Sequence, residues 1–143
     1  MRLPAAAKME GMKELVFYVG LSCLLTHELD AMTNHEWRVL PIVRMLSEST
    51  GEFVFVVGHI PLFAGIIALV ASTAERTRRL SRIGLCAFLA VHGIGHALSM
   101  GDRSYEFAGP LSNGLIFGAA VFGGLFLVLE WLDGKRSSQK PGT

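Results

Sequence analysis

The chain has 143 residues, of which 51% are hydrophobic and only 17% charged, and its mean hydropathy is +0.45. Because an ordinary soluble domain carries about 25% charged residues, this composition favours a membrane protein. The formal net charge of +1 gives no reason to expect a nucleic-acid partner. Cys23 and Cys86 both lie in apolar runs, so no disulfide framework is expected.

Four segments have the length and composition of membrane-spanning helices, which need roughly 17–25 largely apolar residues. In chain order they are residues 13–31, 51–73, 83–100 and 111–132. The sequence therefore predicts an all-α fold, a four-helix transmembrane bundle over residues 13–133. The N-terminal segment 1–12 and a disordered tail, residues 134–143, are expected to be cytoplasmic.

The connection between the first two spans, residues 32–50, is long for a helical hairpin. Its segment HEWRVLPIVRML, residues 35–46, has basic residues at positions 38 and 44 and is interrupted by Pro41. Its apolar residues are Trp37, Leu40, Ile42, Val43 and Leu46. We expect a short amphipathic segment that either lies on the outer surface of the membrane or folds back as a cap over the bundle.

Basic residues predict how the bundle is oriented. Of the 13 Lys and Arg residues, all but Arg38, Arg44 and Arg103 lie at the ends of the spans that face the termini. Because Lys and Arg accumulate in cytoplasmic loops, both termini should be cytoplasmic, and the connections 32–50 and 101–110 should face outward. The predicted location is the cell inner membrane of a bacterium, as a multi-pass protein.

All five histidines are predicted to lie in the outer half of the membrane or just beyond it. At about 1.5 Å of rise per residue, His27 and His96 lie roughly 6 Å below the outer ends of their spans. His59 and His92 lie roughly 12 Å below them, and His35 falls in the outer connection. Three separate helices thus place imidazole groups at matching depths.

Carboxylates show the same bias toward the outer ends, at Glu28, Asp30, Glu36 and Glu52. Charged groups in a membrane are costly, so they usually face the interior of a bundle and find a partner there. Helical spacing puts a pair of polar residues on one face of each of three spans. These pairs are His27 with Asp30, Glu52 with His59, and His92 with His96.

Imidazole and carboxylate groups together are the common ligands of zinc, iron, copper and manganese in proteins. The predicted metal ligands are His27, His59, His92 and His96. Glu28 and Asp30 are the candidate catalytic groups, as general base or further ligands, and the expected cofactor is a transition metal ion, zinc or iron. A secondary group could support or close the site, namely His35, Glu36, Arg38 and Glu52.

Several functions agree with this pattern. A metal-dependent enzyme would find a lipid or isoprenoid-like substrate in the bilayer, with the metal activating water or dioxygen and Arg38 binding an anionic headgroup. A haem between His59 and His92, at equal depth, is an alternative. Others are a proton-handling path and an interaction subunit with a hydrogen-bonded core and no chemistry. The sequence HELDA is not the zinc-protease motif HExxH, because position 31 is alanine.

The fourth span carries no polar stripe and is rich in glycine. Gly114 and Gly118 are four residues apart, and Gly123 and Gly124 are adjacent. Because small residues let helices approach closely, this helix is expected to pack tightly, and it could form a homo-oligomer with a second copy of the chain. Membrane lipid is the other expected partner.

Five short motifs lie in or near the histidine-containing segments: His27-Glu-Leu-Asp-Ala, His35-Glu-Trp-Arg, Leu40-Pro, His59-Ile-Pro and His92-x3-His96. Together they resemble a family of small bacterial four-helix membrane proteins of unknown function, which is similar to the proteins named for an HxxEE motif. The likeness is strongest over residues 24–41. Against HxxEE itself, this chain has Asp30 and Ala31 in place of the two glutamates. The resemblance implies a multi-spanning helical bundle and no particular activity.

Overall fold

The computed structural model describes the backbone of residues 5–138 and the side chains of residues 7–135. Within that range the chain forms four α-helices and two short 3-10 helices, and no strand. In chain order they are α1 (Ala5–Thr33), η1 (Glu36–Arg38), η2 (Val43–Met45), α2 (Glu48–Val70), α3 (Glu75–Ser99) and α4 (Pro110–Ser138). The predicted all-α fold, with a short segment between the first two long helices, is confirmed.

All four long helices are long and apolar enough to cross a membrane, and each coincides with one predicted span apart from its ends. α1 begins at Ala5, inside the segment expected to precede the bundle, and α3 begins at Glu75, so the arginines of the expected loop belong to its first turns. α4 continues to Ser138. The predicted tail is therefore helical at its start, and residues 139–143 lie outside the described part of the chain.

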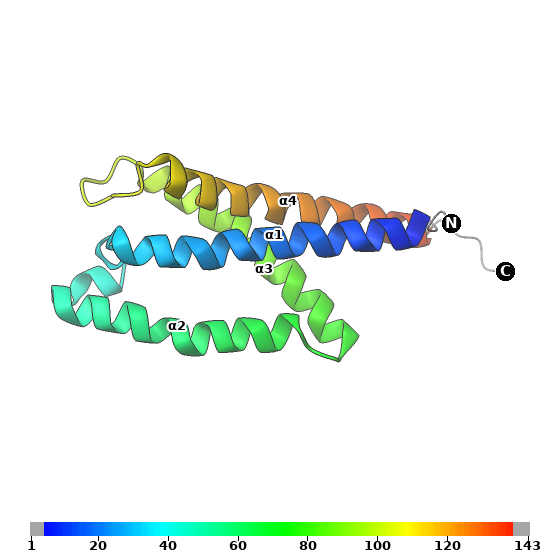
Figure 1. Ribbon diagram of the computed structural model, residues 1–143, viewed down its shortest axis with the longest axis horizontal. Coiled ribbons are helices and arrows are strands. Elements are labelled where there is room, and N and C mark those ends of the chain that lie inside the picture. The colour runs from blue at the N-terminus through cyan, green and yellow to red at the C-terminus, as the bar shows by residue number, and fades with distance from the viewer. Residues whose placement is uncertain (1–4, 139–143) are drawn as a thin grey trace.

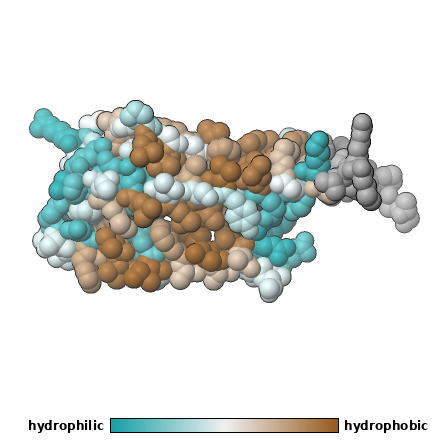
Figure 2. Space-filling model, in the orientation of Figure 1, coloured by the Kyte–Doolittle hydropathy of each residue, from teal (hydrophilic) through white to brown (hydrophobic). Residues whose placement is uncertain are grey.

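The two ends of the bundle differ in chemistry. One end, here called the basic end, holds the start of α1, the α2–α3 turn and the end of α4 (Figure 1). The opposite end, here called the histidine end, holds η1, η2 and the 100–109 connection. Figure 2 shows hydrophilic surface at both ends and a mainly hydrophobic surface between them, as expected for a bundle that crosses a bilayer.

α3 packs closely on α4, while α1 and α4 run antiparallel beside each other (Figure 1). The close approach depends on glycine. A Cβ at Gly123 would lie 2.7 Å from the carbonyl oxygen of Cys86, and a Cβ at Gly93 would lie 2.6 Å from the Cβ of Ala120. Nothing lies within 4 Å of a Cβ added at two other glycines of α4, Gly114 and Gly124. Part of the glycine pattern thus serves packing within the chain.

The connections at the histidine end fold back over the bundle. Trp37 of η1 is 5% exposed, and Phe107 of the 100–109 connection is fully buried. Both belong to an apolar cluster with Ala31, Phe55 and Ile116. The 32–50 connection therefore acts as a cap at η1, which decides between the two arrangements that the sequence allowed, although Ile42 and Met45 beyond it are exposed. This cap determines the surroundings of the histidines.

α2 stands apart from the other long helices. It packs on α3, η1 and η2, and an opening separates much of it from α1 (Figures 1 and 2). Its buried residues are Gly51, Phe55, His59 and Val70. The remaining surface is largely apolar and exposed, which suits contact with lipid chains. A polar contact nevertheless joins α2 to α1, at His59.

Candidate metal centre

Four potential ligands converge at the histidine end, from three elements of the chain. His27 comes from α1, Glu36 from η1, and His92 and His96 from α3. One ligand atom from each side chain lies within 4.8 Å of the others. His27 is fully buried and Glu36 is 5% exposed, so the group is shielded from bulk solvent. These four residues are called the His3Glu cluster below.

Local backbone geometry directs the carboxylate inward. α1 ends at Thr33, and the next turn is closed by a hydrogen bond from the backbone N–H of Asn34 to the carbonyl oxygen of Asp30, at 3.0 Å. His35 then adopts the left-handed conformation, with φ 48° and ψ 47°. This conformation reverses the chain after a helix, so η1 folds back and Glu36 reaches the rings of α1 and α3.

The spacing within the His3Glu cluster is too wide for hydrogen bonds and suits an ion. Glu36 Oε2 lies 3.6 Å from His27 Nε2, and Glu36 Oε1 lies 3.8 Å from His96 Nε2. Two ligands held about 2.1 Å from a tetrahedral zinc ion are about 3.4 Å apart. The three rings lie edge to face, with centroids 4.5 to 5.1 Å apart.

Several polar atoms of the cluster are buried without a hydrogen-bond partner among the described residues. They are both ring nitrogens of His27, Nε2 of His92 and Oε2 of Glu36. Buried polar groups are seldom left unpaired, because each such group costs about 1–3 kcal/mol. A bound cation would satisfy one nitrogen of His27 together with Nε2 of His92 and Oε2 of Glu36, since the two nitrogens of one ring point in different directions. The chemistry of the donors, three imidazoles and one carboxylate, matches a zinc or iron site.

The surroundings of Glu36 disfavour the negatively charged form of its carboxyl group. Burial raises the pKa of its carboxyl group to about 8, and the negative charges of Glu28 and Asp30 raise the pKa in the same direction. Asp30 Oδ2 is itself buried without a hydrogen-bond partner among the described residues. Glu28 and Asp30 thus add to the cost of a negative charge on Glu36, and a cation bound beside Glu36 would offset it.

Tyr105 supports the cluster from the 100–109 connection, a role that could not be predicted from the sequence. Its hydroxyl group lies 3.2 Å from His96 Nδ1. With Nδ1 held by this bond, Nε2 of His96 is directed toward Glu36. Metal-binding histidines are usually oriented in the same way, by a partner on the ring nitrogen that does not bind the metal. Phe107 packs against the rings of both His27 and His96. An aromatic pair in a loop shows no periodicity that would place it here.

His59, predicted as a ligand, lies outside the cluster and uses both ring nitrogens elsewhere. Nδ1 lies 2.6 Å from the carbonyl oxygen of Phe55, and Nε2 lies 2.9 Å from Glu28 Oε2. A carbonyl only accepts, so Nδ1 must donate, and a second proton must then lie between Nε2 and the carboxyl group. Glu28, predicted as catalytic, is therefore engaged in a buried pair that joins α1 to α2.

Of the four secondary residues, Glu36 belongs to the cluster, and His35 and Arg38 form a polar network within the cap. His35 Nδ1 lies 2.8 Å from Glu106, and the guanidinium of Arg38 donates to both Glu106 and Glu48 at 2.8 Å. These bonds lower the pKa of Glu106, with the bond to His35 as the largest cause. Glu52, expected to share a polar face with His59, is exposed instead.

A pocket of about 180 Å³ adjoins the cluster. Glu36, His92 and His96 line its inner side, and Pro41 and Tyr105 are among the residues of its outer walls. The volume is sufficient for several waters or for part of a small organic group. A ligand bound at the cluster would thus have space beside it on one side.

Comparison with known proteins gives one match and two negative results. Neither curated proteins nor solved structures match the chain. A link to the HxxEE proteins is not shown and stays a prediction. The match is to a family model described as a family of unknown function, and it covers residues 13–133. The chain therefore belongs to the family of unknown function DUF6713.

Proposed function

We propose that this chain is an integral membrane protein that binds one transition metal ion, zinc or iron, in the outer half of its helix bundle. The ligands are the four residues of the His3Glu cluster. The observation that carries the proposal is the convergence of four donor atoms within 4.8 Å, most of which are buried and lack hydrogen-bond partners among the described residues. A cation satisfies all of them at once.

We further propose that the site is catalytic and acts on a lipid-like substrate. Catalytic zinc sites keep a position open for water or substrate, and the 180 Å³ pocket lined by Glu36, His92 and His96 supports the proposal because it offers space for one. Its wall includes Val39, Leu40 and Pro41, which suit an apolar substrate. The metal would activate water or dioxygen. Asp30, with a buried oxygen that has no partner among the described residues, is the better candidate base, because Glu28 is paired with His59.

A haem bridging His59 and His92 is less well supported. His59 already uses both ring nitrogens, so ligation to iron would break its contact with Phe55 or with Glu28. A macrocycle between any two rings of the His3Glu cluster would require those rings to separate, because their centroids lie at most 5.1 Å apart.

Elemental analysis of protein purified in mild detergent without chelators tests the metal proposal. Wild type should contain about one zinc or iron per chain, and His92→Ala and His96→Ala should each lose it, since a metal site with three remaining ligands binds far more weakly. His59→Ala and His35→Ala are the matched controls, and both should retain the metal. Metal-free wild type, or metal that survives His92→Ala and disappears in His59→Ala, would contradict the proposed ligand set.

A further inference from the structure

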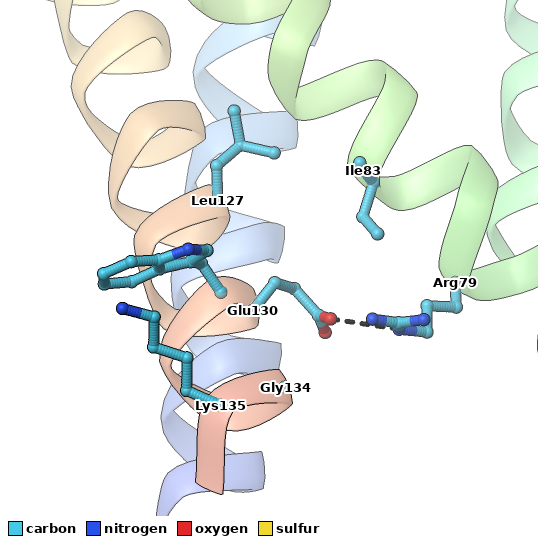
Figure 3. A pocket seen from close by; sticks show the side chains of 7 residues that line it. Arg79, Ile83, Leu127, Glu130, Gly134 and Lys135 are labelled. Carbon is cyan, nitrogen blue, oxygen red and sulfur yellow. Dashed lines mark hydrogen bonds and ion pairs between the residues drawn. The ribbon is translucent and has the colours of Figure 1, made fainter. Parts of the chain in front are cut away.

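A second feature lies at the basic end, far from the histidines. A groove of about 700 Å³ runs between α3 and α4 and is open to the surroundings of the bundle. Ile83, Leu127 and Trp131 give it apolar walls, and Arg79, Glu130 and Lys135 line its charged edge (Figure 3). It shares no lining residue with the pocket beside the metal centre.

The groove exists because α3 and α4 diverge. The two helices are in close contact where Gly123 meets Cys86, and α3 then leans away from α4 toward its own N-terminus (Figure 1). Near the basic end only long side chains can bridge the widening gap. Arg79 Nε reaches Glu130 Oε2 across it at 3.1 Å (Figure 3).

The edge of the groove carries two cations, Arg79 and Lys135, against one anion, Glu130. Glu130 accepts hydrogen bonds from both Lys13 and Arg79, at 3.1 Å each, and Lys13 also pairs with Glu10 and Asp133. Within the described part of the chain, the two terminal amino groups of Arg79 have no hydrogen-bond partner. The ammonium group of Lys135 lies 3.7 Å from the centre of the Trp131 ring, at the groove edge.

A third cation lies beside these two. A neighbouring hollow of about 370 Å³ meets the groove at Arg79 and is lined by Arg76, Leu80 and the acidic Glu75 as well. Arg76 and Arg79 therefore line one continuous edge, and Lys135 lies on the facing helix. The surface thus combines a basic rim, formed by Arg76, Arg79 and Lys135, with an apolar trough, formed by Ile83, Leu127 and Trp131.

We propose that this groove binds an anionic phospholipid. The phosphate group would contact Arg76 and Arg79 on α3, the flexible side chain of Lys135 would leave the indole and approach the headgroup from α4, and an acyl chain would cover Ile83, Leu127 and the indole of Trp131. Basic pockets between membrane helices recognise anionic headgroups, and tryptophan marks the depth at which headgroups lie. A free phosphate ion would leave the apolar trough uncovered, so the combination of trough and rim selects a lipid.

Native mass spectrometry of the full chain in detergent, titrated with phosphatidylglycerol or with phosphatidylcholine of the same acyl chains, tests the charge recognition. Wild type should bind one phosphatidylglycerol more tightly than phosphatidylcholine. The double variant Arg79→Gln/Lys135→Gln should bind phosphatidylglycerol about 25-fold more weakly, roughly fivefold for each cation removed. The control Arg44→Gln/Arg103→Gln removes two cations from the histidine end. An equal loss in this control would show that only overall charge matters, which overturns the proposal.

A second pair of variants tests the apolar trough and does not alter any charge. Gly134 lines the groove, and a Cβ there meets no atom within 4 Å, so Gly134→Leu should fill the trough without disturbing the fold. It should lower phosphatidylglycerol affinity at least tenfold. The matched control Gly114→Leu, equally open but at the other end of α4, should leave affinity unchanged. Unchanged binding in Gly134→Leu, or full displacement of the lipid by millimolar inorganic phosphate, would overturn the proposal.

Discussion

Among single residues, Glu36 shows how a local backbone conformation can place a buried carboxyl group in the candidate site. It is a buried carboxylate near two other acids, and it reaches the cluster because His35 takes a left-handed conformation just before it. A buried carboxylate without a partner destabilises a fold, whereas the same group beside a cation stabilises it. The contribution of Glu36 to stability should therefore change sign when the metal binds.

Glu36→Gln tests this directly. The amide keeps the shape of the side chain and removes its charge, so the metal-free variant should be more stable than metal-free wild type by about 1–3 kcal/mol. With zinc added, wild type should become the more stable protein, because the variant has lost a charged ligand. Thermal unfolding in detergent, with and without metal, measures both differences. A variant less stable than wild type under both conditions would show that Glu36 has a structural role only.

At the scale of elements, the glycines of α4 divide into two groups with different neighbours. Gly123 touches the backbone of α3 at Cys86, whereas its neighbour Gly124 has open space around it. The same short motif thus contains one position that holds the bundle together and one that faces outward. The predicted homo-oligomer would have to use outward positions such as Gly124 and Gly114.

This pair gives a matched test one residue apart. Gly123→Ala places a methyl group 2.7 Å from the Cys86 carbonyl oxygen, so it should destabilise the fold by about 1–3 kcal/mol. Gly124→Ala should be neutral or stabilising by up to about 1 kcal/mol, because alanine favours a helix over glycine. Unfolding in detergent checks both. Equal effects at the two positions would contradict the packing described for α3 and α4.

At the scale of the whole molecule, the apolar middle and the two hydrophilic ends define a direction across the membrane (Figure 2). Arg76, Arg78, Arg79 and Arg82 all lie near the basic end, in the first turns of α3. The rule that positive charge stays inside predicts a cytoplasmic location for that end. The metal centre and its cap would then face outward.

The orientation is tested by accessibility in intact cells. A cysteine introduced at exposed Arg44, in the cap region, should react with a membrane-impermeant maleimide, and one introduced at exposed Arg76 should react only after the membrane is permeabilised. The native cysteines are buried or half-buried, and wild type serves as the background control. Labelling of the Arg76 variant alone in intact cells would reverse the orientation.

The four long helices, and the end of the bundle at which the histidines lie, could be predicted from the sequence alone. Both follow from local properties, because hydropathy over about 20 residues predicts a span and the rise per residue gives depth within it. His27, His92 and His96 could be grouped in this way. The extension of α1 and α3 beyond the apolar stretches was missed, since polar residues at helix ends carry no hydropathy signal.

Which polar side chains contact one another could be seen only in the tertiary structure. Helix rotation and the path of the cap depend on contacts between residues far apart in sequence, such as Gly123 with Cys86. Those contacts turn His59 toward Glu28 and bring Glu36, which the sequence treated as a secondary residue, into the centre of the cluster. A one-dimensional pattern gives the depth of a side chain in the membrane, but the direction in which it points is determined by the packing of the helices.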